Sequence, residues 1–366
     1  MATQAVDLSG SLLETFEIAG SRLVHGKVFP LGIRPRSGTE FGSVEEAAAH
    51  FQQLADGQMF QQLLRDPDGA ILFRGFPVDG AADLDRLVRS FGLPRPHVEV
   101  GLSGKRSTIT PLVKTANEEP AHVRFYFHNE YGRSAYFPGA LFFHAEKVPT
   151  EGGQTPLLSS LELYDRLVAE LPAFIADLAA KGIIGRQYFP AKADVEAKTI
   201  GWNRRDSYGF DIVEGDSTAT QRRKVEAVLR TRQQAEGEWQ ANGALYVLQR
   251  LPAIRRIAAT GRPTFFNGLS GVYGRQRDRQ ALAPPHRGID GGVHLPTTFG
   301  DGTAIPTADL ERLLQIQEDI RFLVPWQAGD VALVDNYTVQ HARTPWKGER
   351  SLLVSLWDGW ETFVPY

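Results

Sequence analysis

The pattern of hydrophobic and polar positions divides the chain into regions of different secondary structure. Residues 43–65 and 83–91 carry apolar side chains at helical spacing. Between them, residues 70–73 form a short, uninterrupted apolar run that is typical of a strand. The first quarter of the chain therefore predicts a strand flanked by two helical segments.

Sheet and helix alternate through the rest of the chain. Residues 108–158 form short runs rich in Val, Phe and Tyr, broken by Pro and Gly, which is typical of sheet. Ser159 precedes Glu162 by three residues, a capping box that predicts the start of a helix. Further helices are predicted at 172–182 and 218–233, and further strands at 239–251, 263–267, 331–334 and 352–357.

This order of elements predicts a mainly β protein with flanking helices, of the α+β class. A helical insertion is expected at about 159–233. No internal repeat, low-complexity tract or linker interrupts the 366 residues. We therefore expect a single domain that spans 1–366.

Composition and charge exclude several classes of partner. The formal net charge of -3 gives no long-range attraction to nucleic acid or to an anionic membrane. No stretch approaches the roughly 18 consecutive apolar residues that span a bilayer, and the N-terminal residues do not resemble a secretory signal. A cytoplasmic protein with a small-molecule substrate is expected, and a homo-oligomer is compatible with the sequence.

The chain has no cysteine, so any metal must be held by nitrogen and oxygen ligands. His128 and Glu130 are two residues apart, and in a strand both would point to the same face. Taken alone, such a pair is more often a surface ion pair, and a lone His341 more often a core histidine. Together, His128, Glu130 and His341 would supply two imidazoles and a carboxylate, which leave three octahedral positions open as in non-haem Fe(II) oxygenases. Structural zinc would instead take four protein ligands.

A second group of residues suits a dicarboxylate. Residues 344–349 are interpreted as a turn between two antiparallel strands, a hairpin that would set Arg350 beside His341. A buried guanidinium needs an anionic partner, and its planar fork suits a carboxylate such as the far end of 2-oxoglutarate. The turn at 152–153 precedes Thr155, whose hydroxyl can donate to the same carboxylate. Arg343 is a rival anchor.

With these residues in place, the chain resembles the taurine dioxygenase and clavaminate synthase-like family of Fe(II)/2-oxoglutarate-dependent oxygenases from about Ile71 to Trp357. The resemblance rests on Phe-His-Asn-Glu, Glu-Gly-Gly-Gln-Thr-Pro, Pro-Trp-Gln-Ala-Gly-Asp-Val and His-Ala-Arg-Thr-Pro-Trp, in that order along the chain. It implies a double-stranded β-helix, or jelly roll, with an insertion between the halves of the core. It also implies that iron is bound by His128, Glu130 and His341, and 2-oxoglutarate by Thr155 and Arg350.

The same resemblance implies a dioxygenase that consumes O2 and converts 2-oxoglutarate to succinate and CO2. Glu130 in place of the small residue of halogenases favours hydroxylation or desaturation over chlorination. Relatives often act on amino acids or small acids, so an amino-acid-like substrate is expected. Its candidate contacts are Asn129, Tyr126, Arg106, Arg124 and Asn267.

Two other classes of function compete with this one. A non-catalytic jelly-roll protein could bind a metal or a small acid, since a fold alone does not decide function. However, such a binder has no evident use for an open iron face. A zinc hydrolase with the same ligands is disfavoured, because no general base stands out and Arg350 would lack a partner.

Overall fold

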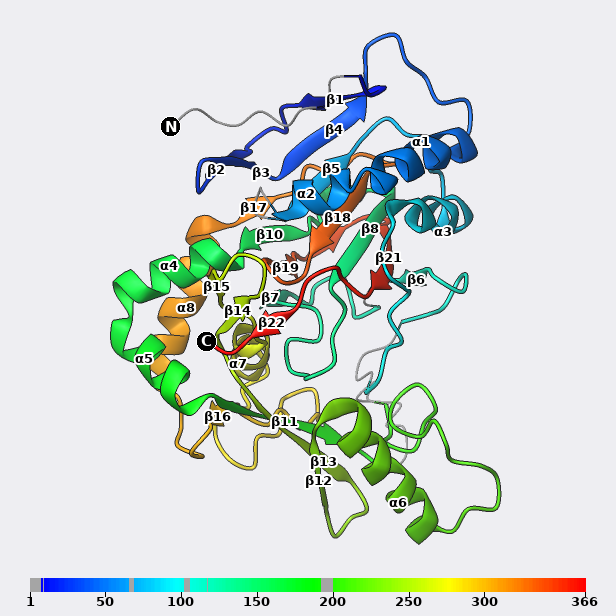
Figure 1. The fold of residues 1–366 in the computed structure, drawn as a ribbon. Coiled ribbons are helices and arrows are strands. Elements are labelled where there is room, and N and C mark those ends of the chain that lie inside the picture. The colour runs from blue at the N-terminus through cyan, green and yellow to red at the C-terminus, as the bar shows by residue number, and fades with distance from the viewer. Residues whose placement is uncertain (1–7, 9, 66–68, 102–105, 117, 192–199) are drawn as a thin grey trace.

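Two β-sheets packed face to face form the centre of the fold (Figure 1). The computed structural model describes residues 8, 10–65, 69–101, 106–116, 118–191 and 200–366. Within them, the larger sheet has seven strands, in the order β1 (Leu13–Phe16), β4 (Leu31–Pro35), β5 (Ala70–Phe73), β18 (Val331–Asp335), β8 (Ala140–Lys147), β21 (Ser351–Trp357) and β6 (Lys114–Thr115). The smaller has four, in the order β17 (Phe322–Leu323), β10 (Pro156–Ser159), β19 (Val339–Arg343) and β7 (Phe125–His128).

One buried apolar cluster joins the facing sides of these sheets. Phe143 of β8 and Val354 of β21 come from the larger sheet, and Leu157 of β10 and Val339 of β19 come from the smaller one. Apolar residues that interlock between two sheets are the core of a β-sandwich. The expectation of a mainly β protein with flanking helices is confirmed by this arrangement of mixed α and β elements, in which the sheets dominate.

Helices at the start of the chain cover the outer face of the larger sheet (Figure 1). They are α1 (Val44–Asp56), α2 (Met59–Arg65), α3 (Ala81–Val88) and the 3-10 turn η1 (Arg89–Phe91). Phe51 of α1 lies within 5.5 Å, ring centre to ring centre, of Phe60, Phe73, Phe76 and Phe91. Such close aromatic packing confirms the predicted layer of helix and strand.

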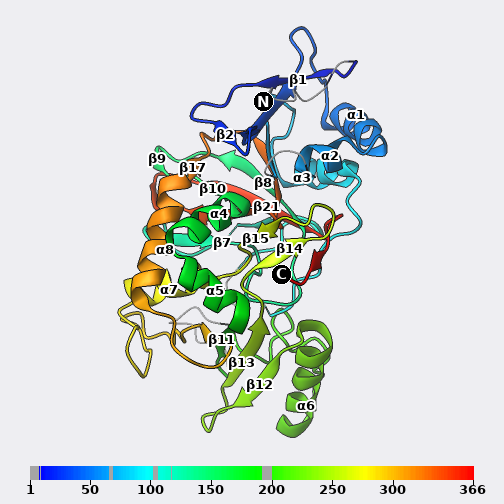
Figure 2. The same cartoon turned by 60° about the vertical axis from the view of Figure 1, so that its left-hand side comes forward.

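A second group of helices covers the outer face of the smaller sheet (Figure 2). It consists of α4 (Ser160–Glu170), α5 (Pro172–Lys181), α7 (Leu269–Asp278) and α8 (Thr307–Ile320). The predicted start of α4 is confirmed, because the Ser159 hydroxyl accepts a hydrogen bond from the backbone N–H of Glu162 at 3.2 Å. The Glu162 carboxylate accepts from Arg22 at 2.8 Å.

The segment predicted as a helical insertion, about 159–233, is only partly helical. It contains α4, α5, α6 (Thr218–Val228) and the π-helical turn η2 (Leu229–Gln233), but also the strand β11 (Ile183–Phe189). β11 belongs to a third sheet, in the order β12 (Glu236–Trp239), β13 (Leu245–Leu251), β11 and β16 (Thr298–Phe299), at the end of the molecule opposite α1 (Figure 1). The prediction was wrong because β11 finds its partner β13 more than fifty residues later, a long-range pairing that local periodicity cannot show.

Short strands complete the described elements. A three-stranded sheet is formed by β15 (Pro263–Thr264), β14 (Arg255–Ile257) and β22 (Phe363–Val364), and two-stranded pairs by β2 (Arg22–Val24) with β3 (Lys27–Phe29) and by β20 (Trp346–Lys347) with β9 (Glu151–Gly152). Between His341 and Arg350 the chain forms β20, which pairs with β9. β19 and β21, which flank β20 in the chain, lie in opposite sheets. The predicted hairpin is therefore wrong, and Arg350 reaches the site from the larger sheet.

No helix among the described residues is long and apolar enough to cross a membrane.

Candidate metal centre and co-substrate site

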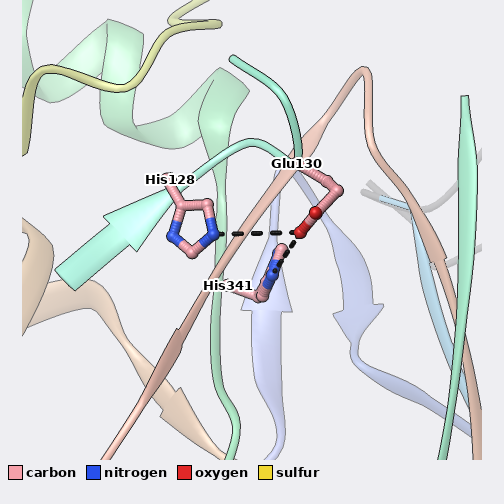
Figure 3. A group of neighbouring side chains, drawn as sticks. All are labelled: His128, Glu130 and His341. Carbon is pink, nitrogen blue, oxygen red and sulfur yellow. Dashed lines mark ion pairs between the residues drawn. The ribbon is translucent and has the colours of Figure 1, made fainter. Parts of the chain in front are cut away.

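Three side chains from two neighbouring segments converge between the sheets. β7 and β19 are antiparallel, and His128 stands directly opposite His341, with ring centres 4.5 Å apart. The Glu130 Oε2 lies 3.3 Å from the His341 Nε2 and 3.9 Å from the His128 Nε2 (Figure 3). Phe143 of the larger sheet closes the site from behind, 5.2 Å from the His341 ring. One ligand atom from each of the three residues lies within 4.8 Å of the other two.

The local reason for this convergence differs from the one expected. β7 ends at His128, so Glu130 lies in the turn that follows and not on the strand face. Asn336 fixes that turn, because its Oδ1 accepts from the Glu130 N–H at 2.7 Å and its Nδ2 donates to the Glu130 carbonyl at 2.9 Å. His341 lies in the middle of β19. The three predicted residues do meet. The pairing of β7 with β19 brings His128 and His341 together, and the turn after β7 brings Glu130 to them, so alternation along one strand is not the cause.

The protonation states suit metal binding. The Nδ1 of His128 lies 2.8 Å from the carbonyl oxygen of Tyr126, which can only accept, so Nδ1 carries the proton and Nε2 is left as a donor atom. Burial, and then the neighbouring His341, lower the pKa of His128 to about 4, which keeps the ring neutral near pH 7. Burial raises the pKa of Glu130, but Arg106 and the two imidazoles outweigh it and hold that pKa well below its ordinary value.

The donor set fits ferrous iron. Two neutral imidazole nitrogens and one carboxylate oxygen are available, and the part of the chain that the structure describes brings no fourth His, Asp or Glu into the group. Three protein ligands on one side leave positions for a keto acid and dioxygen, as in non-haem Fe(II) oxygenases. A closed four-ligand shell of structural zinc is not formed.

A buried ion-pair network surrounds the outer oxygen of Glu130. Arg106 donates to the Glu130 Oε1 at 2.8 Å and to the Glu99 Oε1 at 3.1 Å. Tyr131 also donates to the Glu99 Oε1, at 3.0 Å, and Lys114 pairs with the other Glu99 oxygen. The side chains of Glu99 and Arg106 are only 6% and 14% exposed. Arg106, predicted as a substrate contact, thus lies at the site but binds the predicted metal ligand. Glu99 was missed, because nothing in its local sequence distinguishes it from a surface glutamate.

This network predicts that Arg106 supports metal binding. We expect Arg106→Gln to weaken Fe(II) affinity about 10- to 100-fold, because partners that orient a ligand carboxylate have effects of this size. The measurement is an anaerobic Fe(II) titration against a competing chromophoric chelator, which does not depend on turnover. Arg95→Gln is the matched control, because Arg95 pairs with Asp358 on an exposed surface. Equal Fe(II) affinity in Arg106→Gln and wild type would contradict the role.

The residues predicted to bind 2-oxoglutarate lie beside the centre. Thr155 is buried, and its hydroxyl accepts from the Trp326 Nε1 at 3.3 Å. Arg350 donates from Nε to the Gly153 carbonyl at 2.9 Å, and its guanidinium lies 5.0 Å from the centre of the Trp346 ring. Burial, and then Arg343, lower the pKa of Arg350 to about 10, as expected of a guanidinium with no carboxylate of the described residues beside it.

Arg343, the rival anchor, is engaged differently. Its guanidinium donates to the carbonyls of Glu119, Pro120 and Val123 at 3.2, 3.3 and 2.8 Å. It also lies 4.4 Å from the centre of the Phe125 ring. These contacts hold Arg343 against the 119–125 segment, whereas Arg350 has a single backbone acceptor through Nε. The comparison favours Arg350 as the carboxylate anchor.

The other predicted substrate contacts make hydrogen bonds within the fold. The Tyr126 hydroxyl donates to Asp278 at 2.9 Å and accepts from Arg277 at 2.8 Å, on α7. Arg124 pairs with Glu318 of α8 and lies 4.9 Å from the Tyr126 ring centre. Tyr126 and Arg124 are therefore engaged with α7 and α8 in this structure.

Asn129 and Asn267 connect strands and loops. The Asn129 Nδ2 donates to the carbonyls of Asn336 and Val339 at 2.9 and 3.2 Å, and its Oδ1 accepts from the Asn267 N–H at 3.2 Å. The Asn267 Nδ2 donates to the Ala253 carbonyl at 3.0 Å, and its Oδ1 accepts from the Leu269 N–H at 3.0 Å. Their amides therefore satisfy buried backbone groups, and the Asn129 Nδ2 uses both of its hydrogens in this structural role.

An Fe(II) centre of this type, with buried arginines beside it, defines the class of 2-oxoglutarate-dependent oxygenases. Residues 33–357 match the family model described as taurine catabolism dioxygenase TauD, TfdA family. The chain belongs to this family. As a member of this family it is a dioxygenase, an oxidoreductase that uses Fe(II), 2-oxoglutarate and O2.

Several known proteins are similar over most of their length. A clavaminate synthase-like protein of Arabidopsis thaliana is 30% identical, over 94% of this chain and 98% of that protein. A dapdiamide synthesis protein of Enterobacter agglomerans is 25% identical, over 79% of this chain and 82% of its own. The crystal structure of a taurine dioxygenase from Burkholderia xenovorans is 14% identical with a TM-score of 0.46, covering 95% of this chain and 91% of that one.

Proposed function

We propose that this dioxygenase oxidises an unactivated C–H bond of a small, amino-acid-like molecule while 2-oxoglutarate is converted to succinate and CO2. Hydroxylation is the simplest outcome, and desaturation or cyclisation would use the same centre. The observation that carries the proposal is the group of His128, Glu130 and His341, which lacks a fourth protein donor among the described residues. The relative described as a dapdiamide synthesis protein supports a small-molecule substrate.

The roles of the residues follow from their contacts. His128, Glu130 and His341 would hold the metal, which when bound supplies the activation of O2. The Tyr126 carbonyl orients the His128 ring, and Arg106 keeps Glu130 ionised and turned towards the imidazoles. Arg350 would bind the far carboxylate of 2-oxoglutarate through two parallel hydrogen bonds, and Thr155 would add a hydroxyl. Phe143 and the apolar cluster between the sheets exclude water from one side.

We also propose that the two facing sheets form a double-stranded β-helix and that 1–366 is one domain. The proposal is supported by the core that both sheets share and by the third sheet, of which β11, β12 and β13 lie between α5 and α7 in the chain. On this view the insertion is a mixed unit of helix and strand that lies at one end of the core.

An anaerobic titration tests the proposed function. Fe(II) and then 2-oxoglutarate are added to the protein, and the weak visible charge-transfer band of the chelate should appear and saturate. After O2 is admitted, succinate should form. No band at saturating 2-oxoglutarate would favour a hydrolase or a protein that binds the metal alone. A band without any succinate would favour the non-catalytic binder.

A further inference from the structure

One arginine near the metal centre has no partner in the structure. Arg133, three residues after Glu130, makes no hydrogen bond or ion pair with the described residues, although it is only partly exposed. Burial, and then the neighbouring Arg275, lower its pKa to about 10. A desolvated guanidinium without a counter-charge is costly, and an anionic ligand would lower that cost.

The start of α7 shows how close Arg133 lies to the metal ligands. A Cβ atom placed on Gly268 would lie 2.5 Å from the Arg133 Cγ, and one placed on Gly271 would lie 3.9 Å from the His128 Cβ. These two glycines are three residues apart at the beginning of the helix, so they face the same side. The stem of Arg133 and the Cβ of His128 therefore both pack against the start of α7.

The charges around Arg133 define what it can bind. Arg275 lowers the pKa of both Arg133 and Arg343, and Arg343 lowers that of Arg350, so each of these guanidinium groups has another arginine as an electrostatic neighbour. Glu119 pairs with Arg275 at 2.9 Å. Arg350 is the proposed anchor for 2-oxoglutarate. Arg133 has no carboxylate of the described residues beside it.

We propose that Arg133 binds a carboxylate of the primary substrate and so makes this enzyme selective for small carboxylic acids. The inference rests on the proposed function and deepens it. A single planar fork suits one carboxylate bound by two parallel hydrogen bonds. The adjacent Arg275 is already paired, so the site is not built for a doubly charged phosphate. Binding there would hold the substrate beside the start of α7, the helix that also packs against the Cβ of His128.

The test compares acids with their uncharged counterparts. Succinate formed from 2-oxoglutarate is measured with each standard L-amino acid and with its α-carboxamide. We expect at least one amino acid to stimulate succinate formation and its amide to be inactive. In Arg133→Gln, the concentration of that amino acid needed for half-maximal stimulation should rise about 10- to 100-fold, the usual effect of losing a charged hydrogen bond. Arg133→Lys should show a smaller rise.

Controls separate this role from folding and from the proposed function. Arg133→Met keeps an apolar stem against Gly268, so it should lose the amino acid response while the 2-oxoglutarate chelate band still forms. Arg256→Gln removes an arginine of β14 that bonds the Gly261 carbonyl, and should behave as wild type. Amides as active as acids, an unchanged half-maximal concentration in Arg133→Gln and Arg133→Met, or no stimulation by any acid would each overturn the inference. Absence of the chelate band in wild type would instead contradict the proposed function.

Discussion

Replacing His128 or His341 with alanine should abolish succinate formation, with a loss of at least about 100-fold. Each imidazole supplies one of three protein donors, and the open face of the centre leaves no spare residue to take its place. Loss of the metal removes several kcal/mol of stabilisation, and each 1.36 kcal/mol corresponds to about a tenfold change in rate. The measurement is succinate formed per enzyme at saturating Fe(II) and 2-oxoglutarate, together with the iron content of the purified variants.

His25→Ala is the matched control for these variants. His25 pairs with Asp165 at an exposed position, and it should retain both iron and activity. Iron bound at wild-type levels by both alanine variants, with succinate formation intact, would show that the metal is held elsewhere. Loss of activity in His25→Ala as well would point to a general effect of the substitution on folding.

Arg350→Ala should weaken 2-oxoglutarate binding by at least about 30-fold, while iron is still bound. Removing one partner of a buried, hydrogen-bonded charge pair costs about 2–5 kcal/mol, because the other charge is left unpaired. The affinity is measured from the chelate band in an anaerobic titration. The 2-oxoglutarate affinity of Arg350→Lys should lie between those of wild type and Arg350→Ala, since an ammonium cannot form the two parallel hydrogen bonds. This separates binding of the co-substrate from turnover.

Arg343→Ala decides between the two arginines. Arg343 donates to three backbone carbonyls of the 119–125 segment, so its loss should lower stability more than 2-oxoglutarate affinity. A large loss of affinity in Arg343→Ala together with an unchanged affinity in Arg350→Ala would reverse the assignment. Thermal unfolding of both variants, measured beside the titrations, distinguishes a folding defect from a binding defect.

Local signals in the sequence predicted many helices and strands correctly. Ser159 begins α4, α5 starts at Pro172, and α6 with η2 covers 218–233 as expected. These features depend on capping and periodicity within a few residues, which a sequence displays directly. By contrast, β11 was missed and the hairpin between His341 and Arg350 was wrong, because both depend on which distant strand becomes the neighbour.

In the metal centre, too, the sequence indicated some features and only the fold decided others. His128, Glu130 and His341 could be selected from residue type, spacing and family resemblance, and the structure brings them together. The reasons for their convergence could not be read in advance: Asn336, more than 200 positions away, fixes the turn of Glu130. The pairing of Arg106 with Glu130, and with the overlooked Glu99, likewise appears only when distant segments fold together.

The sequence by itself determined the kinds of ligand atoms available, the local helices and the family motifs, because these depend on residue identity and short spacing. The tertiary structure alone decided which charges are paired and which are left for ligands. Tyr126, Arg124, Asn129 and Asn267 look available in the sequence but make hydrogen bonds or ion pairs within the fold. Arg133 has no distinguishing local signal, yet it is partly buried near the centre without a counter-charge among the described residues. Burial and pairing are properties of the packed chain, since they are set by contacts between segments that are distant in sequence.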